Sequence, residues 1–285
     1  MTEVETTLPK TSSAEEEAAN VQQAPSEEGG LPLFYTQEGT TTALIAVVGP
    51  RGGGKSTLMV ALAPLLAPKE RLVVISPVTA IGKRLGCEVE VRYGTDETNE
   101  EYFGNFLKRG KRVVLVIDEF DEYCPAGVQS KYGGYCCDAL YRIVNYGRNE
   151  PWCIGMLVSF RGASDVTTNL LRAANVMFIA RTQEPNALDY FARYLGREYS
   201  EMLRHLPNYV FVVWAEGRLF GYVKVVNGEV TWVNPPAGWP TPAEAQSNAT
   251  SAEAGSTQVD ASAAPTGSAP MPMEPANPAS GSSPP

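Results

Sequence analysis

The most constraining feature of the sequence lies in residues 42–66, where an apolar run leads through a glycine-rich turn into an Ala/Leu-rich run. Within it, Gly49, Gly54, Lys55 and Ser56 satisfy the spacing G-x-x-x-x-G-K-[ST]. The Val/Ile/Leu run before the turn is typical of a strand, and the run after it is typical of an amphipathic helix. The stretch therefore predicts a phosphate-binding loop (P-loop) between a buried strand and a helix.

Each residue type in this loop has a physical role. Glycines let successive backbone N–H groups point inward at phosphate oxygens, and the positive end of the following helix adds to the attraction. We expect Lys55 to reach the β- and γ-phosphates, Ser56 to ligate Mg²⁺, and Thr57 to be buried or to contact the α-phosphate. The predicted ATP-binding residues are Gly49, Pro50, Arg51, Gly52, Gly53, Gly54, Lys55, Ser56 and Thr57.

A second motif follows at residues 112–123, RVVLVIDEFDEY. Its five consecutive apolar residues predict a strand buried on both faces, and in parallel sheets ligands bind at the carboxyl ends of the strands. We expect Asp118 to hold Mg²⁺, and Glu119 to polarise the attacking water and accept its proton. We interpret Asp121 and Glu122 as part of a solvated acidic loop. This Walker B pattern predicts an enzyme that hydrolyses ATP.

The rest of the central region alternates between strand and helix patterns. This alternation predicts an α/β, RecA-like P-loop fold with a mainly parallel central sheet flanked by helices. C-terminal β segments would extend the sheet or form an antiparallel edge, with a hairpin turn at 226–229. The predicted strands are 41–49, 71–76, 112–117, 152–159, 175–181, 209–214, 219–226 and 229–233. The predicted helices are 55–63, ended or kinked by Pro64, then 95–109, 138–146, 165–174, 184–196 and 197–205.

Composition divides the chain into three parts. Residues 1–30 carry seven Glu and one Lys, and residues 237–285 carry four acidic and no basic residues; both are rich in Ala, Ser, Thr, Pro and Gly. Such segments cannot bury enough apolar surface to offset the entropy of ordering, so we predict disordered tails on either side of a P-loop domain at 31–236. That domain has 22 Lys and Arg against 21 Asp and Glu, so the net charge of −9 does not exclude a nucleic-acid partner.

Several classes of protein are excluded by simple counts. The sequence has no run of 18 apolar residues, and its N-terminus is acidic where a signal peptide would be basic and then apolar, so we expect a soluble, cytosolic protein without a transmembrane segment. The five cysteines lack paired C-x-x-C spacing, which argues against a zinc site or a disulfide framework.

The order of motifs resembles the FtsK/HerA superfamily of DNA-pumping ATPases, and within it the genome-packaging ATPases of tailless viruses with an internal membrane. The segments that carry the resemblance are VVGPRGGGKST, VVLVIDEFDEY, YGRNEPWCIGMLVSFRGASDVTTNLLRAANVMFIAR and EPNALDYFARYLG, and it covers about residues 41–226. Family members often place a sensor Gln before the Arg of the fourth-strand motif. Here Phe160 occupies that position, and Gly162 replaces the Pro of the family pattern.

The resemblance implies a homo-hexameric ring with ATP bound between subunits. A cation from the neighbouring subunit would then neutralise charge on the γ-phosphoryl group. Arg148 and Arg161 are the candidates for that arginine finger or for a sensor within the same subunit. Double-stranded DNA would pass through the ring, with candidate pore contacts at Lys131, Tyr132, Lys83 and Arg84.

The sequence therefore favours an ATP-driven double-stranded DNA translocase that packages a viral genome into a preformed capsid. It would act in the host cytoplasm or at the virion vertex, docked on a capsid or viral membrane protein. One alternative is a plasmid-transfer, segregation or phage-assembly ATPase of the same superfamily. Others are a small-molecule or nucleoside kinase, which would activate a hydroxyl in place of water, and a non-hydrolysing structural protein. The adjacent Asp118 and Glu119 favour water as the nucleophile.

Overall fold

The computed structural model describes residues 39–109, 112–127, 131–149 and 151–245. Its strands form one sheet in the order β3-β2-β4-β5-β1-β6-β7-β8-β9. The predicted N-terminal tail lies outside the described residues, as does the predicted C-terminal tail from residue 246 onward. The strand bounds are β1 Leu44–Val48, β2 Leu72–Ser76, β3 Val89–Val91, β4 Val114–Ile117, β5 Gly155–Phe160, β6 Val176–Ala180, β7 Val210–Ala215, β8 Arg218–Val226 and β9 Glu229–Val233.

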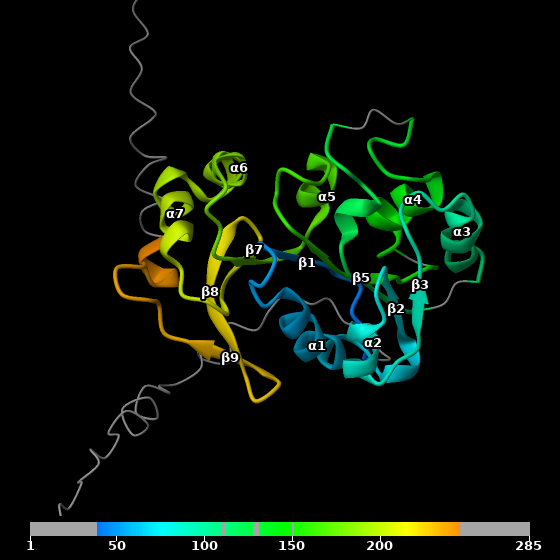
Figure 1. Cartoon of the computed structure of the whole chain (residues 1–285), viewed down its shortest axis with the longest axis horizontal. Helices are drawn as coiled ribbons and strands as arrows, with labels where there is room; N and C mark the ends of the chain where they lie inside the picture. The colour runs from blue at the N-terminus through cyan, green and yellow to red at the C-terminus, as the bar shows by residue number, and fades with distance from the viewer. Residues whose placement is uncertain (1–38, 110–111, 128–130, 150, 246–285) are drawn as a thin grey trace, which may run out of the picture. The chain divides into compact units, whose positions relative to one another are not determined.

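The sheet is parallel from β3 to β6 and antiparallel from β6 to β9. Parallel neighbours need a crossover that brings the chain back to the same end, and the helices supply it. Figure 1 shows α1 and α2 on one face of the sheet, with α3, α4, α5 and α6 on the other. The helix bounds are α1 Lys55–Leu66, α2 Ala80–Leu85, α3 Asn99–Arg109, α4 Asp138–Tyr146, α5 Thr168–Ala173, α6 Pro185–Leu195 and α7 Arg197–Met202. The predicted fold is thus confirmed.

The central strands are buried on both faces because each face has its own apolar layer. Along β1, Leu44, Ala46 and Val48 belong to the core under α3 to α6, whereas Ile45 and Val47 belong to the core under α1 and α2. This alternation follows from the two-residue period of a strand. It explains why the P-loop strand reads as a continuous apolar run.

Three local differences from the sequence expectation have physical causes. Helix α1 does not end before Pro64 but continues to Leu66, whose carbonyl accepts a hydrogen bond from the Thr41 N–H at 2.7 Å. A proline so close to a helix end removes one hydrogen bond only. The other two differences are α2 and β3, which lie between residues 77 and 94, where no helix or strand was predicted. Strand β3 has three residues and forms by pairing with β2. The sequence pattern does not reveal this pairing.

The C-terminal hairpin agrees with its prediction. Val226 pairs with Glu229, and Asn227 and Gly228 between them have φ values of +52° and +86°. Positive φ at both central residues is the signature of a type I′ turn. Beyond β9, the ring of Trp239 packs edge-on against Tyr222 at 5.6 Å, so the first residues of the predicted C-terminal tail contact the domain. Among the described residues, no helix is long and apolar enough to cross a membrane.

Gly94 gives a test of packing next to the Walker B loop. A Cβ at this position would collide with the backbone carbonyl of Glu122. Gly94→Ala is therefore expected to lower the free energy of unfolding by about 1–3 kcal/mol, measured by urea denaturation. The matched control is Gly104→Ala in α3, where the nearest atom to a new Cβ is 3.9 Å away; it should raise stability by about 0.5–1 kcal/mol. Equal effects of the two substitutions would contradict the packing account.

Candidate active site

The P-loop lies at the carboxyl ends of the parallel strands. Strand β1 pairs with β5 on one side and β6 on the other, which sets Val48 beside Phe160 and Ile179. The next residue, Gly49, donates its N–H to the Phe160 carbonyl at 3.2 Å, and a Cβ on it would stand 2.5 Å from the Ala180 Cβ. The close approach of β6 therefore explains the first glycine of the motif.

A cavity of about 320 Å³ opens beside this loop. Gly54, with φ +87°, turns the chain into α1 at its edge. The cavity brings together residues of the P-loop and of the Walker B strand that are more than 60 positions apart in the sequence. Its lining is Arg51, Gly52, Gly54, Lys55, Ser56, Thr57, Asp118, Glu119 and Tyr209. Six of the nine predicted ATP-binding residues and both predicted magnesium ligands thus face one space, whereas Gly49, Pro50 and Gly53 do not line it. Tyr209 joins the lining from outside the predicted set.

Lys55 is folded back onto its own loop. Its Nζ donates hydrogen bonds to the carbonyl oxygens of Gly49, at 2.8 Å, and Pro50, at 3.2 Å. Burial lowers the pKa of Lys55, while the nearby Asp118, Asp121 and Glu119 carboxylates oppose that shift. Phosphate oxygens in this cavity would offer the ammonium group stronger, charge-assisted partners than these carbonyls.

Asp118 is held rigidly at the end of β4. It is 6% exposed, and its Oδ1 accepts hydrogen bonds from the Ser159 hydroxyl and, at 3.2 Å, from the Glu119 N–H. Ser159 lies in β5, and the pairing of Ile117 with Val158 sets it beside Asp118. Ser159 was not among the predicted site residues, although a hydroxyl near the end of an otherwise apolar strand was a visible signal.

Glu119 and Arg161 form an ion pair beside the cavity. The Arg161 Nη2 lies 2.9 Å from the Glu119 Oε2, and its Nε lies 3.8 Å from the Asp121 Oδ2. The hydrogen bond from Arg161 to Glu119 is the main cause that raises the pKa of Arg161. Glu119 has φ +54°, a backbone conformation that is uncommon for a residue with a side chain. Arg161 therefore lies beside the Walker B carboxylates of its own chain.

The interpretation of Asp121 as a solvated residue is wrong. Its side chain is 14% exposed, its Oδ1 is buried without a hydrogen-bond partner in the described structure, and burial raises its pKa. Phe160, which stands where relatives often have a sensor Gln, is fully buried in the core. No sensor amide comes from that position, so the polar contacts to Walker B come from its neighbours Ser159 and Arg161.

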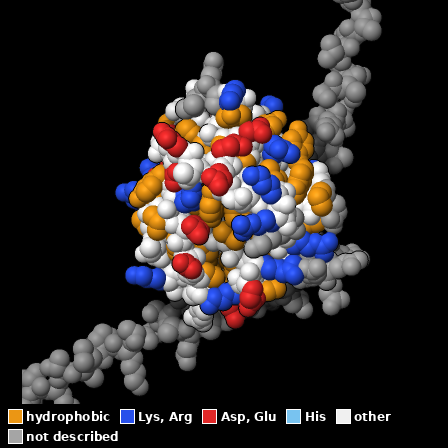
Figure 2. Space-filling model, turned by 90° about the vertical axis from the view of Figure 1, so that its right-hand side faces the viewer, with side chains coloured by type: hydrophobic (Ala, Val, Ile, Leu, Met, Phe, Trp, Pro, Cys, Tyr) orange, Lys and Arg blue, Asp and Glu red, His pale blue; other side chains and the backbone are white. Residues whose placement is uncertain are grey.

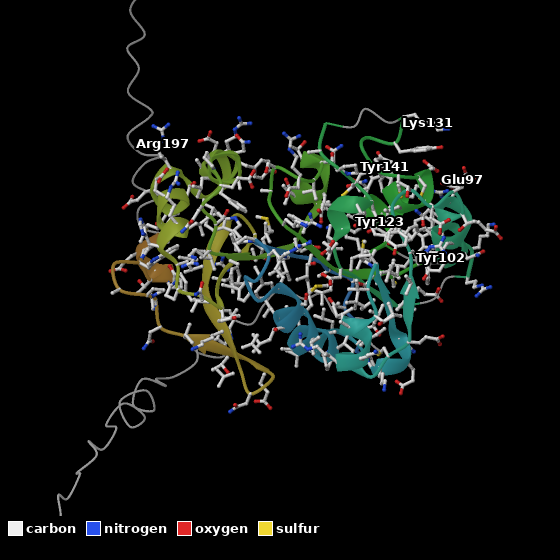
Figure 3. The ribbon with its side chains drawn as sticks, in the orientation of Figure 1. Glu97, Tyr102, Tyr123, Lys131, Tyr141 and Arg197 are labelled. Carbon is white, nitrogen blue, oxygen red and sulfur yellow. The ribbon has the colours of Figure 1, made fainter. Side chains whose placement is uncertain are left out.

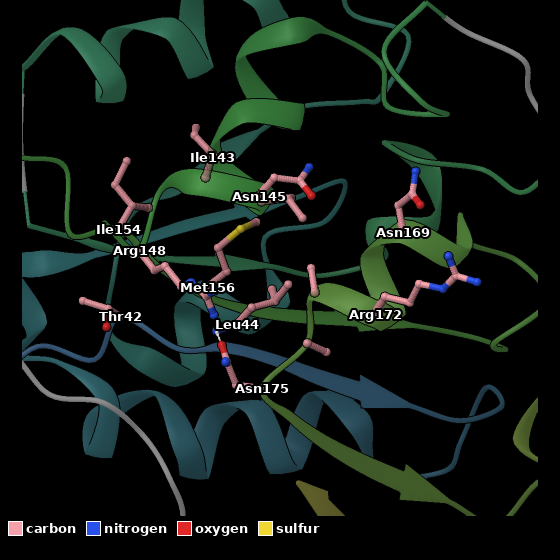
Figure 4. Close-up of a pocket in the computed structure, with 13 residues that line it drawn as sticks. Thr42, Leu44, Ile143, Asn145, Arg148, Ile154, Met156, Asn169, Arg172 and Asn175 are labelled. Atoms are coloured by element: carbon pink, nitrogen blue, oxygen red, sulfur yellow. Dashed lines mark hydrogen bonds between the residues drawn. The ribbon is translucent and has the colours of Figure 1, made fainter. Parts of the chain in front are cut away.

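Arg148 lies at the end of the sheet opposite the P-loop, where the parallel strands have their amino ends. It follows α4 and lines a cavity of about 340 Å³ together with Leu44 and Met156, which stand at the amino ends of β1 and β5 (Figure 4). Leu44 and Val48 are four steps apart along β1, on the order of 13 Å, and the P-loop begins beyond Val48. The structure thus separates Arg148 from the P-loop of its own chain. A second arginine, Arg172, lines the same cavity.

The predicted pore contacts fall in two places. Arg84 lies beside α1 and donates a hydrogen bond to the Thr57 hydroxyl at 3.3 Å, which places it next to the P-loop. Lys131 lies at the periphery of the domain (Figure 3), with its Nζ 4.6 Å from the centre of the Tyr132 ring. The face on the side of α3 and β3 shows Lys and Arg interspersed with Asp and Glu (Figure 2), so its charge is mixed.

The donor set at the cavity suits Mg²⁺. Ser56 and Asp118 offer oxygen ligands, and both hydrogen bonds that Asp118 accepts within the described structure go to Oδ1, which leaves Oδ2 as a ligand. Among the described residues, no group of three or more His, Cys, Asp or Glu side chains could hold a metal ion. Mg²⁺ is usually bound by one or two protein ligands and completes its shell with phosphate oxygens and water.

The fold and the site together define a P-loop ATPase. The chain belongs to the ATPase family associated with various cellular activities (AAA), whose family model matches residues 45–203. ATP hydrolysis, as predicted from the sequence, is the activity of this family. No curated protein matches the chain.

Three solved structures illustrate the similarity. The genome packaging NTPase B204 from Sulfolobus turreted icosahedral virus 2, in complex with ATP-gammaS, is 17% identical, with a TM-score of 0.49 over 68% of this chain and 98% of that one. EssC (ATPases 2 and 3) from Geobacillus thermodenitrificans is 13% identical, with a TM-score of 0.44 over 73% and 42%. The pCW3 conjugation coupling protein TcpA is 15% identical, with a TM-score of 0.43 over 76% and 72%. A viral genome-packaging NTPase is thus among the structures to which the chain is similar.

Proposed function

We propose that this chain is an ATP-driven translocase of double-stranded DNA that packages a viral genome into a preformed capsid. The proposal combines the hydrolytic site with the order of motifs from residue 147 to 184. This order distinguishes the FtsK/HerA superfamily from other P-loop proteins better than the Walker motifs alone. In this role the protein acts as a homo-hexameric ring, in the host cytoplasm or at the virion vertex, with a capsid or viral membrane protein as its docking partner. The DNA-contact candidates are Lys131, Tyr132 and Lys83.

In the proposed reaction, Lys55 and the loop N–H groups hold the β- and γ-phosphates. Glu119 accepts a proton from water as the water oxygen attacks the γ-phosphorus and the bond to the β-phosphate oxygen breaks, giving ADP and inorganic phosphate. Mg²⁺, held by Ser56 and Asp118, would offset negative charge on the phosphates. The ion pair of Glu119 with Arg161 must loosen for the carboxylate to reach water, and Arg161 can then turn to the phosphates.

The observation that carries the ring assembly is the separation of Arg148 from its own P-loop. Its guanidinium is exposed at the amino ends of the strands, whereas the phosphate cavity lies at their carboxyl ends. A cation in this position can stabilise γ-phosphoryl charge only in a neighbouring subunit. We therefore assign Arg148 as the finger that acts in trans and Arg161 as the sensor that acts in cis.

Mixed rings test this assignment. Arg148→Ala alone and Glu119→Gln alone are each expected to lose ATPase activity, and a mixture of the two should regain part of it. A subunit interface that takes Glu119 from the first variant and Arg148 from the second is complete. The matched control is Arg142→Ala, an exposed arginine of α4 outside the cavity, which should keep its activity without mixing. Absence of recovery in the mixture would contradict action in trans.

DNA dependence separates the proposal from its rivals. Linear double-stranded DNA should raise the steady-state ATPase rate of the intact protein, and the protein should displace a third strand from a DNA triplex only with ATP present. A rate that DNA leaves unchanged and a nucleoside raises steeply would instead indicate a kinase. A DNA-stimulated ATPase encoded beside plasmid-transfer genes, with no capsid gene near it, would favour the conjugative alternative.

A further inference from the structure

A second cavity lies next to the phosphate cavity, along the P-loop. It has a volume of about 250 Å³ and is lined by Pro50, Arg51, Gly52, Gly53, Arg181, Asn208 and Tyr209. It shares Arg51, Gly52 and Tyr209 with the first cavity. The two spaces therefore meet along the outer surface of the P-loop, at the Tyr209 side chain. Arg181 and Asn208 belong to the second space and take no part in the phosphate cavity.

The order of the strands in the sheet indicates the direction in which a nucleotide bound at the P-loop extends. Strands β4 and β5, which carry Glu119 and Arg161 at their ends, lie on one side of β1, and β6 and β7 lie on the other. Hydrolysis requires the γ-phosphate to lie beside Glu119. The α-phosphate and the nucleoside then extend away from β4 and β5. The second cavity lies in that direction, because Arg181 follows β6 and Tyr209 precedes β7.

Tyr209 itself has the features of a ligand-binding aromatic residue. Its side chain is 51% exposed, and its backbone has φ +63°, which costs on the order of 1–3 kcal/mol in a residue with a bulky side chain. Its ring lies against the P-loop, since a Cβ on Gly54 would stand 2.8 Å from the Tyr209 Cδ1. An exposed aromatic ring in a strained conformation, fixed at the junction of two cavities, is placed to stack on a planar group.

We propose that the second cavity is the nucleoside subsite and that the Tyr209 ring stacks on the base of the bound nucleoside triphosphate. The Arg181 guanidinium and the Asn208 carboxamide supply the polar contacts to the ribose and the base edge. Stacking uses the face of the base and is tolerant of its identity, so base selectivity rests on Asn208, which offers both a donor and an acceptor. The proposal rests on the P-loop being the triphosphate site.

Two ligands distinguish binding at this subsite from binding at the P-loop. They are ATP, and inorganic tripolyphosphate, which lacks a nucleoside. Tyr209→Gly removes the ring and suits the left-handed backbone, so the variant should fold at least as stably as the wild type. By calorimetry with Mg²⁺, it should bind ATP roughly 5- to 100-fold more weakly and tripolyphosphate as before. Tyr209→Phe, which keeps the ring, should bind both ligands like the wild type.

A fluorescent variant gives an independent readout. In Tyr209→Trp, ATP should quench the emission of the new indole, and tripolyphosphate should not. The proposal is overturned if Tyr209→Gly binds ATP as tightly as the wild type, or loses ATP and tripolyphosphate in equal proportion. If the wild type binds neither ligand, the P-loop assignment fails and the subsite fails with it. If it binds and hydrolyses ATP without any response to DNA, the translocase proposal alone fails.

Discussion

Glu119→Gln is expected to lower the steady-state ATPase rate by about 100-fold or more while ATP binding survives. The substitution keeps the size and shape of the side chain but removes the group that accepts the proton from water. It also removes the ion pair with Arg161, which is a solvent-exposed pair worth roughly 0.2–1 kcal/mol, so the variant should remain folded. The measurement is phosphate release at saturating ATP, together with the dissociation constant of ATP.

The matched control for this experiment is Glu122→Gln. Glu122 belongs to the same acidic run and lies three residues further on, but it does not line the phosphate cavity. Its loss should leave the ATPase rate close to that of the wild type. An unchanged rate in Glu119→Gln, or equal losses in the two variants, would remove Glu119 from the role of general base.

Lys55→Met is expected to weaken ATP binding itself, by roughly 10- to 100-fold, and to abolish detectable hydrolysis. Methionine keeps an apolar stem of similar length but cannot donate to phosphate oxygens. In the absence of nucleotide the same ammonium group holds the Gly49 and Pro50 carbonyls, so part of the loss would come from a less ordered loop. The dissociation constant of ATP, measured by calorimetry, reports the combined effect.

Lys83→Met serves as the control for Lys55→Met. Lys83 is an exposed lysine of α2 that lines neither cavity at the P-loop. It should bind ATP like the wild type, whereas a general effect of lost positive charge would weaken binding in both variants. If Lys55→Met binds ATP as tightly as the wild type, Lys55 does not contact the phosphates and the P-loop assignment is wrong.

The parts of the site that could be predicted from the sequence are those formed by neighbouring residues. Gly49 to Thr57 follow one another at a single strand-to-helix turn, and Asp118 and Glu119 are adjacent at the end of one strand. Spacing along the chain fixes such groups because a short backbone segment has few allowed conformations. The sequence also predicted an α/β class and antiparallel C-terminal strands, because hydrophobic periodicity reports strands and helices directly.

Other parts depended on pairing between distant strands. Ser159 reaches Asp118 because β5 lies next to β4 in a particular register, and a one-residue shift would turn its hydroxyl away. The same pairing places Arg161 beside Glu119 and buries Phe160. Short elements such as β3 escaped prediction for a related reason, since three residues carry no period of their own and are stabilised by the neighbouring strand.

The sequence by itself therefore determined that this protein has a phosphate-binding loop and a carboxylate pair suited to ATP hydrolysis. Only the tertiary structure decided where other residues lie relative to them. Arg161 pairs with Glu119, and Tyr209 packs against a loop about 150 residues earlier in the chain, whereas Arg148 lies at the amino ends of the strands, away from the P-loop. The physical reason is that a motif is set by the conformations of consecutive residues, whereas strand order, register and packing depend on contacts between residues far apart in the sequence.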